Sequence, residues 1–116
     1  MKATIYYNPR CSKSRATLAL LEDRGVELQI VEYLVSPPSS DTLQALVEKL
    51  GISLRDLIRS GEAEFAAANV DLDSATSEEI LALLTEIPKL IQRPIVEVDQ
   101  GARIGRPPEA VLELFE

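Results

Sequence analysis

The fold is decided by residues 3–15, which read ATIYYNPRCSKSR. Residues 3–7 are rich in β-branched and aromatic side chains, which favour a buried strand, and Asn8-Pro9 closes that strand with a turn. Beyond Cys11, apolar side chains suit a largely buried helix up to Gly25, a residue that commonly ends a helix. The stretch therefore predicts a strand that passes directly into a helix, with Cys11 at the junction.

The rest of the chain predicts a second strand, a helical section, a hairpin and a final helix. The predicted elements are strands at 3–7, 26–33, 94–98 and 102–104, and helices at 12–24, 41–50, 52–59, 76–88 and 109–115. A strand-helix-strand unit pairs its strands in parallel, whereas a hairpin is antiparallel. We therefore expect an α/β fold of thioredoxin or glutaredoxin type, with a four-stranded mixed sheet, forming a single domain over 1–116 with a helical insert at about 37–88.

Length and composition favour a small intracellular domain. The chain has 116 residues, 46% of them hydrophobic, which is enough for one core without disulfide staples. We expect a cytoplasmic monomer, because one cysteine closes no intrachain disulfide and neither a spanning segment nor a signal peptide is recognisable. The net charge of -7 argues against nucleic acid or an anionic membrane as partner. Without histidine or a second cysteine, we expect no metal site and no imidazole catalysis.

Cys11 is the candidate nucleophile. A strand-to-helix junction places it at the N-terminus of the helix, where free backbone N–H groups and the helix dipole favour an anion. Arg10, Lys13 and Arg15 add positive charge, so we expect the pKa of the thiol to lie well below that of a free cysteine. The same donors suit attack on a small oxyanion.

A second interpretation treats Cys11 as a small apolar core residue, which is the commoner role of a lone cysteine. Polar and cationic neighbours on both sides argue against an apolar niche and favour the functional interpretation. Ser12 and Ser14 are the candidates for capping the start of the helix. The three tyrosines are interpreted as packing residues.

Four separated motifs carry a family resemblance. They are residues 6–15, YYNPRCSKSR; 51–59, GISLRDLIR; 90–96, LIQRPIV; and 103–109, RIGRPPE. In this order the chain resembles the ArsC family of glutaredoxin-dependent arsenate reductases over almost its whole length. The resemblance implies a thioredoxin-like fold with a helical insert and a nucleophile at Cys11.

The resemblance also implies a set of binding residues. Arg59, Arg93 and Arg106 match the family positions that contact arsenate or its covalent adduct, and a guanidinium suits a tetrahedral oxyanion because it offers paired, permanently charged donors. Taken singly, each arginine is also compatible with ordinary surface charge. Pro94 matches the cis-proline that thioredoxin-like folds place beside the cysteine.

The function implied by the resemblance is reduction of arsenate to arsenite, with glutathione as co-substrate, glutaredoxin as protein partner and no bound cofactor. Two alternatives stay open: a monothiol reductase acting on glutathione mixed disulfides, and an Spx-like regulator that binds RNA polymerase. The lone cysteine weighs against the latter, whose redox switch pairs two cysteines. Tyr7 stands where many of these reductases have histidine, and Ser12-Lys13 where many have glycine-threonine. The Cys-Ser-Lys-Ser form of this chain resembles a shorter subgroup of the family.

Overall fold

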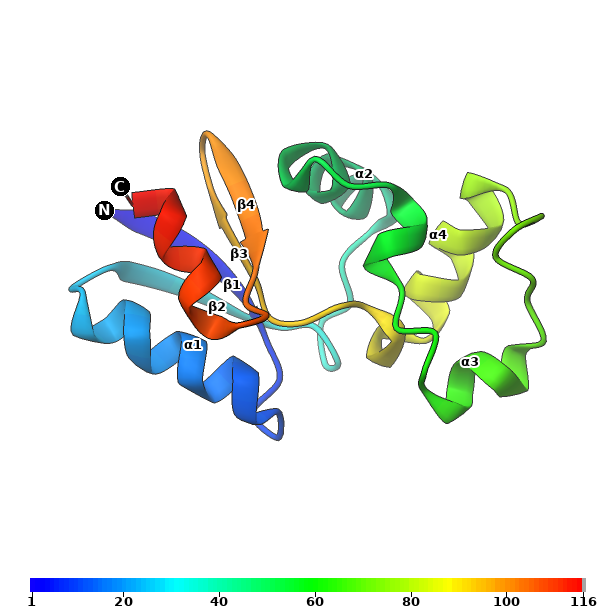
Figure 1. The fold of residues 1–116 in the computed structure, drawn as a ribbon, viewed down its shortest axis with the longest axis horizontal. Helices are drawn as coiled ribbons and strands as arrows, with labels where there is room; N and C mark the ends of the chain where they lie inside the picture. The colour runs from blue at the N-terminus through cyan, green and yellow to red at the C-terminus, as the bar shows by residue number, and fades with distance from the viewer. Residues whose placement is uncertain (116) are drawn as a thin grey trace. The chain divides into compact units, whose positions relative to one another are not determined.

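The computed structural model describes residues 1–115, which form two compact units. The first unit joins residues 1–36 to the chain from Arg93 onward, and the second comprises Pro37–Gln92. The elements of the first unit are β1 (Lys2–Tyr7), α1 (Ser12–Asp23), β2 (Glu27–Glu32), β3 (Ile95–Val98), β4 (Gly101–Ile104) and the 3-10 helix η3 (Pro108–Phe115). They can be followed along the colours of Figure 1.

The sheet of the first unit is mixed and has the strand order β2-β1-β3-β4. β1 pairs in parallel with β2, and β3 forms antiparallel ladders with both β1 and β4. The four predicted strands, the parallel first pair and the antiparallel hairpin are therefore confirmed. The final helix forms where it was predicted, but as a 3-10 helix.

One face of this sheet carries a hydrophobic core. Side chains that alternate along β1 pack with residues of α1, β3 and η3, so both helices cover the same face (Figure 1). The buried members of this core are Ala3, Ile5, Leu21, Val26, Val96 and Val111. This packing fixes α1, and with it the residue that precedes α1, against the carboxyl end of β1.

The two ends of α1 are capped differently. At its C-terminus the N–H of Gly25 donates to Glu22 and the N–H of Val26 donates to Leu21, the two bonds of a Schellman motif. Gly25 has a φ of 70°, so the predicted helix end is confirmed. At its N-terminus the capping position is Cys11, and no side chain supplies a capping hydrogen bond there. The prediction that Ser12 or Ser14 caps the helix is therefore wrong.

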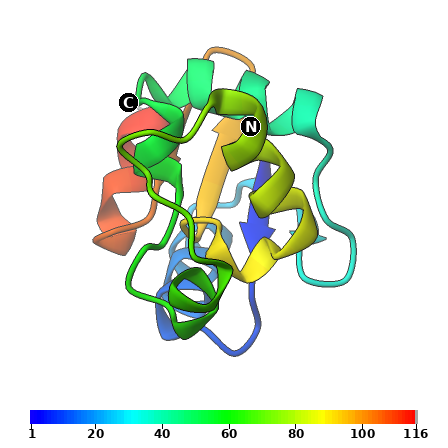
Figure 2. The same ribbon diagram turned by 90° about the vertical axis from the view of Figure 1, so that its right-hand side faces the viewer.

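The regular elements of the second unit are helices (Figure 2). Its elements are α2 (Ser40–Leu50), η1 (Leu54–Leu57), α3 (Ala63–Ala68), α4 (Ser77–Glu86) and η2 (Pro88–Leu90). Thr76 and Glu79 form a reciprocal capping box at the start of α4, and Gly51 follows α2 with a φ of 69°. The start of α4 and the end of α2 lie where the sequence predicts them.

Two features of the second unit differ from the sequence prediction. The predicted helix at 52–59 is only the short η1, because Ile58 is extended and forms an isolated antiparallel bridge with Ile91. Helix α3 was not predicted at all.

That 1–116 is a single domain with an insert at 37–88 stays a prediction. Within residues 1–115, every helix is too short or too polar to span a membrane.

Candidate active site

The turn between β1 and α1 is held by Asn8. Its carbonyl oxygen accepts a hydrogen bond from the N–H of Cys11 at 3.0 Å, and its Oδ1 accepts one from the N–H of Arg10 at 3.0 Å. Its own N–H donates to the hydroxyl of Ser14 at 3.4 Å. Asn8 and Ser14 are both buried, whereas Cys11 is partly exposed. The turn thus presents the thiol at the first position before α1, as the sequence predicts.

The surroundings of Cys11 stabilise its thiolate. Burial raises the pKa of the thiol, but hydrogen bonds from the N–H and hydroxyl of Ser14, from the Arg93 side chain and from the N–H of Lys13 outweigh burial and lower the pKa to about 7. The Ser14 oxygen accepts from Asn8 while its O–H is directed at the sulfur. A large fraction of Cys11 is therefore ionised, and nucleophilic, at neutral pH.

The cation that acts on Cys11 is distant from it in sequence. Arg93, rather than the neighbouring Arg10, Lys13 and Arg15 side chains, provides the cationic hydrogen bond, and Arg15 instead donates to the carbonyl oxygen of Pro9 at 3.0 Å. The predicted low pKa agrees with the structure. That the side chains of the three sequence neighbours add positive charge at the thiol stays a prediction.

Arg93 reaches the thiol from the start of β3. It is 9% exposed, and the peptide bond to Pro94 is cis, as the family resemblance implies. Arg93 lies two residues before Ile95, which pairs with Tyr6 on the neighbouring antiparallel strand. Continuing that register aligns Arg93 with Asn8, at the turn that carries Cys11.

Arg106 is hydrogen-bonded to the backbone of Arg93. Its Nε donates to the carbonyl oxygen of Arg93 at 2.9 Å, and its own bond to Pro107 is also cis. The preceding Gly105 donates to the carbonyl oxygen of Pro94 at 2.9 Å. A Cβ at Gly105 would lie 2.7 Å from both Pro94 Cγ and Thr17 Oγ1, so only glycine allows this approach. Arg93 and Arg106 are therefore placed by one set of backbone contacts.

Arg59 lies in the second unit. Its N–H donates to Leu90 at 2.7 Å, beside the bridge of Ile58 with Ile91, and its Nη2 forms an ion pair with Glu62 at 3.3 Å. The structure thus brings Cys11 and Arg93 together within the first unit and binds Arg106 to the backbone of Arg93. That Arg59, Arg93 and Arg106 contact a bound oxyanion stays a prediction.

Sequence reasoning missed the roles of two side chains. Ser14 was considered only as a helix cap, yet it is the first neighbour that lowers the pKa of Cys11. Tyr33 was interpreted as a packing residue, yet its phenol group faces Arg93 and Asn8. Tyr7, at the position of the family histidine, packs against the core of the first unit. Strand register places this phenol, because extending the Tyr7–Glu32 pair by one residue aligns Asn8 with Tyr33.

The low pKa of Cys11 predicts how its alkylation depends on pH. Above the pKa the thiol is ionised and reacts, so we expect the iodoacetamide rate to reach half its maximum near pH 7, well below the ~8.5 of a free thiol. Ser14→Ala removes a donor to the thiolate and is expected to raise this midpoint. Ser12→Ala, an exposed neighbour, is the control and leaves it unchanged. A wild-type midpoint at or above the free value would contradict the proposed stabilisation.

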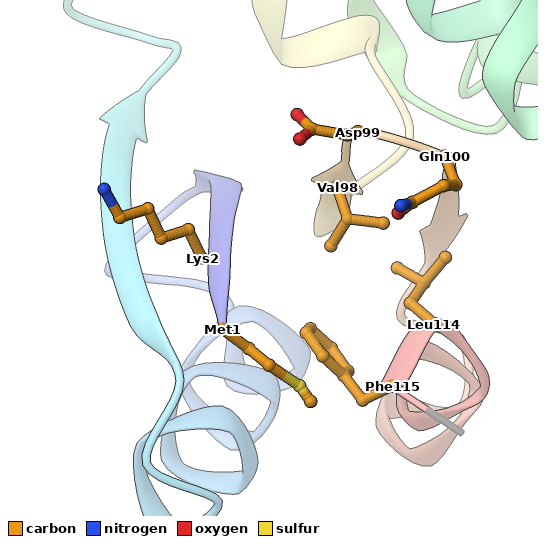
Figure 3. A pocket seen from close by; sticks show the side chains of 7 residues that line it. All are labelled: Met1, Lys2, Val98, Asp99, Gln100, Leu114 and Phe115. Atoms are coloured by element: carbon orange, nitrogen blue, oxygen red, sulfur yellow. The ribbon is translucent and has the colours of Figure 1, made fainter.

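Another concavity of the first unit lies away from this chemistry (Figure 3). Its lining comes from Met1 and Lys2, the β3–β4 turn at 98–100, and the last two residues of η3, Leu114 and Phe115. These residues surround the beginning of β1, whereas Cys11 follows its end. Met1 is 71% exposed, so the concavity is open and lacks a buried reactive group.

Comparisons with known proteins agree with this arrangement. The family model described as "ArsC family" matches residues 6–114. The chain is 43% identical over 116 residues to an arsenate reductase of Haemophilus influenzae, covering 99% of this chain and 100% of that protein. It is 47% identical over 111 residues to the uncharacterized protein YfgD of Escherichia coli K12, covering 95% and 93% respectively. The solved structure of an arsenate reductase from Vibrio cholerae superimposes with a TM-score of 0.94 at 44% identity, covering 97% of each chain.

The mixed sheet, the thiol at the start of α1 and the cis-proline before β3 define a thiol protein of thioredoxin-like fold. Within this class, the match over residues 6–114 shows that the chain belongs to the ArsC family.

Proposed function

We propose that this protein reduces arsenate to arsenite through a covalent adduct on Cys11, which glutathione and glutaredoxin then resolve. The observation that supports it most directly is a thiol with a pKa of about 7 beside the buried Arg93. The relatives named arsenate reductase align with nearly the whole of this chain. We place the reaction in the cytoplasm, where thiols are kept reduced.

The electrons balance as follows. Two thiols give up two electrons and two protons and become one disulfide, while arsenic(V) takes the two electrons and one arsenate oxygen leaves as water. In the first step the Cys11 thiolate attacks arsenic and a sulfur–arsenic bond replaces an arsenic–oxygen bond. Arg93 and Arg106 hold the oxyanion through charge-assisted hydrogen bonds, and we propose that Arg59 joins them. Glutathione thiolate then attacks the Cys11 sulfur, so a sulfur–sulfur bond forms while the sulfur–arsenic bond breaks and its electron pair leaves with arsenite. Glutaredoxin then reduces the Cys11–glutathione disulfide.

A coupled assay tests this proposal. Protein, glutathione, glutaredoxin, glutathione reductase and NADPH are combined with and without arsenate, and NADPH loss is recorded. We expect arsenate-dependent loss that disappears in Cys11→Ser. If arsenate has no effect although the protein is folded and the coupling enzymes are active, the proposal is wrong. A glutathione mixed disulfide in place of arsenate then measures the alternative monothiol reductase activity.

A further inference from the structure

Tyr33, Asn8 and Arg93 are aligned with one another by the register of β2, β1 and β3. It follows Glu32, the last residue of β2, which pairs with Tyr7 on the parallel strand β1. Continuing this register by one residue aligns Tyr33 with Asn8. On the other side of β1, the antiparallel register aligns Asn8 with Arg93. Aligned side chains of neighbouring strands point to the same face of a sheet, so the three lie together at the carboxyl end of β1.

The phenol group of Tyr33 is buried, and no group of the described residues accepts a hydrogen bond from its O–H. The residue is 1% exposed, and within residues 1–115 its hydroxyl oxygen forms no hydrogen bond of good geometry. Buried hydroxyl groups are nearly always paired, and an exception in a native structure calls for an explanation. A ligand absent from the free protein is one such explanation, because it supplies the missing partner when it binds.

The neighbours of this hydroxyl define what it can bind. Burial raises the pKa of Tyr33, Arg93 and Asn8 lower it, and the Cys11 thiolate raises it, so the phenol keeps its proton at neutral pH. Arg93 has only donors, and the Oδ1 of Asn8 accepts from the N–H of Arg10 but not from the phenol. The Cys11 sulfur is near enough to act on Tyr33 electrostatically but forms no hydrogen bond with it. The O–H therefore lacks an acceptor on the side where Cys11 and Arg93 meet.

We infer that the Tyr33 hydroxyl is a donor of the oxyanion site, giving its hydrogen bond to an oxygen of the tetrahedral anion held beside Cys11 and Arg93. The oxygen atoms of an anion joined to the Cys11 sulfur through arsenic lie farther out than the sulfur, so one of them can accept a hydrogen bond that the sulfur does not. The identification of this anion as arsenate rests on the proposed function. That the Tyr33 hydroxyl is a donor to a bound anion rests on its burial and its missing acceptor, whatever the anion is.

Protection of Cys11 from alkylation tests the inference without turnover. Iodoacetamide labelling is followed by mass spectrometry over a range of arsenate concentrations, with phosphate and sulfate as parallel probes, in wild type, Tyr33→Phe and Tyr6→Phe. Tyr6→Phe is the matched control, because Tyr6 is a buried tyrosine of the same sheet face whose hydroxyl bonds to Glu97 instead. Unfolding in urea is measured for all three proteins.

We expect Tyr33→Phe to need about tenfold more oxyanion than wild type for equal protection, since one hydrogen bond to an anion is lost. Tyr6→Phe keeps wild-type protection. The urea midpoint of ligand-free Tyr33→Phe does not fall, because the ring is kept and the phenol donates no hydrogen bond to the described residues of the free protein. A fall would indicate a structural role and contradict the inference. Equal protection of Tyr33→Phe and wild type, or no protection by any of the three oxyanions, also overturns it. Oxyanion protection that depends on Tyr33, but without arsenate turnover, removes the proposed function and leaves the inference in place.

Discussion

Arsenate reduction by Arg93→Ala is expected to fall by about 10- to 100-fold in kcat/KM, because each charge-assisted hydrogen bond to an oxyanion is worth ~1.5 to 3 kcal/mol. The same substitution removes a hydrogen bond to the Cys11 thiolate, so the pKa of the thiol rises. Near neutral pH both effects lower the rate. At alkaline pH the thiol is ionised in both proteins, so only the loss of oxyanion binding persists and the defect becomes smaller.

The measurement is kcat/KM against pH, with alkylation rates recorded on the same samples. Arg93→Lys is expected to recover only part of the activity, because an ammonium keeps the charge but lacks the planar pair of donors. Arg10→Ala is the matched control. Arg10 is next to Cys11 in sequence, yet its side chain is exposed and its charge is screened by solvent. Wild-type kinetics in Arg93→Ala would show that this arginine does not bind the oxyanion. A large defect in Arg10→Ala would show that charges next to Cys11 in sequence dominate its reactivity.

The parts of the fold that the sequence predicted are those that local patterns determine. A run of β-branched residues followed by Asn8-Pro9 specifies a strand and its end, and Gly25 specifies where α1 stops. The shortened η1 depends on Ile58 pairing with Ile91, a contact between segments more than thirty residues apart. Helix α3 is six residues long, has no side-chain cap and buries no residue, so neither periodicity nor capping marks it.

The candidate site also contains residues that local patterns predict and residues that only strand pairing places. Cys11 at the start of α1 follows from adjacent elements, so the sequence alone places the nucleophile correctly. The partners of its thiolate come from strand pairing: Arg93 reaches Cys11 because β3 lies antiparallel to β1. Tyr33 shows why pattern analysis fails for polar groups. An aromatic residue after a strand looks like packing, and only the neighbours of its hydroxyl reveal an unpaired donor.

Without a small thiol, the wild-type protein is expected to stall after at most one covalent event per Cys11 when arsenate is present. Reduction to arsenite takes two electrons, and a thiol enzyme that supplies them ends with its sulfur in a disulfide or an equivalent adduct. Cys11 is the only cysteine of the chain, so no second thiol of the same molecule can close that bond. The resolving sulfur must come from outside, and we expect glutathione to restore turnover.

Mass spectrometry of the stalled and restarted reactions distinguishes the possible routes. We expect a glutathione adduct on Cys11 in the wild type and none in Cys11→Ser, because serine forms no disulfide. No arsenite should be released before glutathione is added, because the Cys11 adduct alone still holds arsenic(V), whereas arsenite should rise steadily once glutathione and glutaredoxin are both present. Sustained turnover with thioredoxin alone would mean that a protein thiol attacks the Cys11 adduct directly. Glutathione would then have no place in the resolving step.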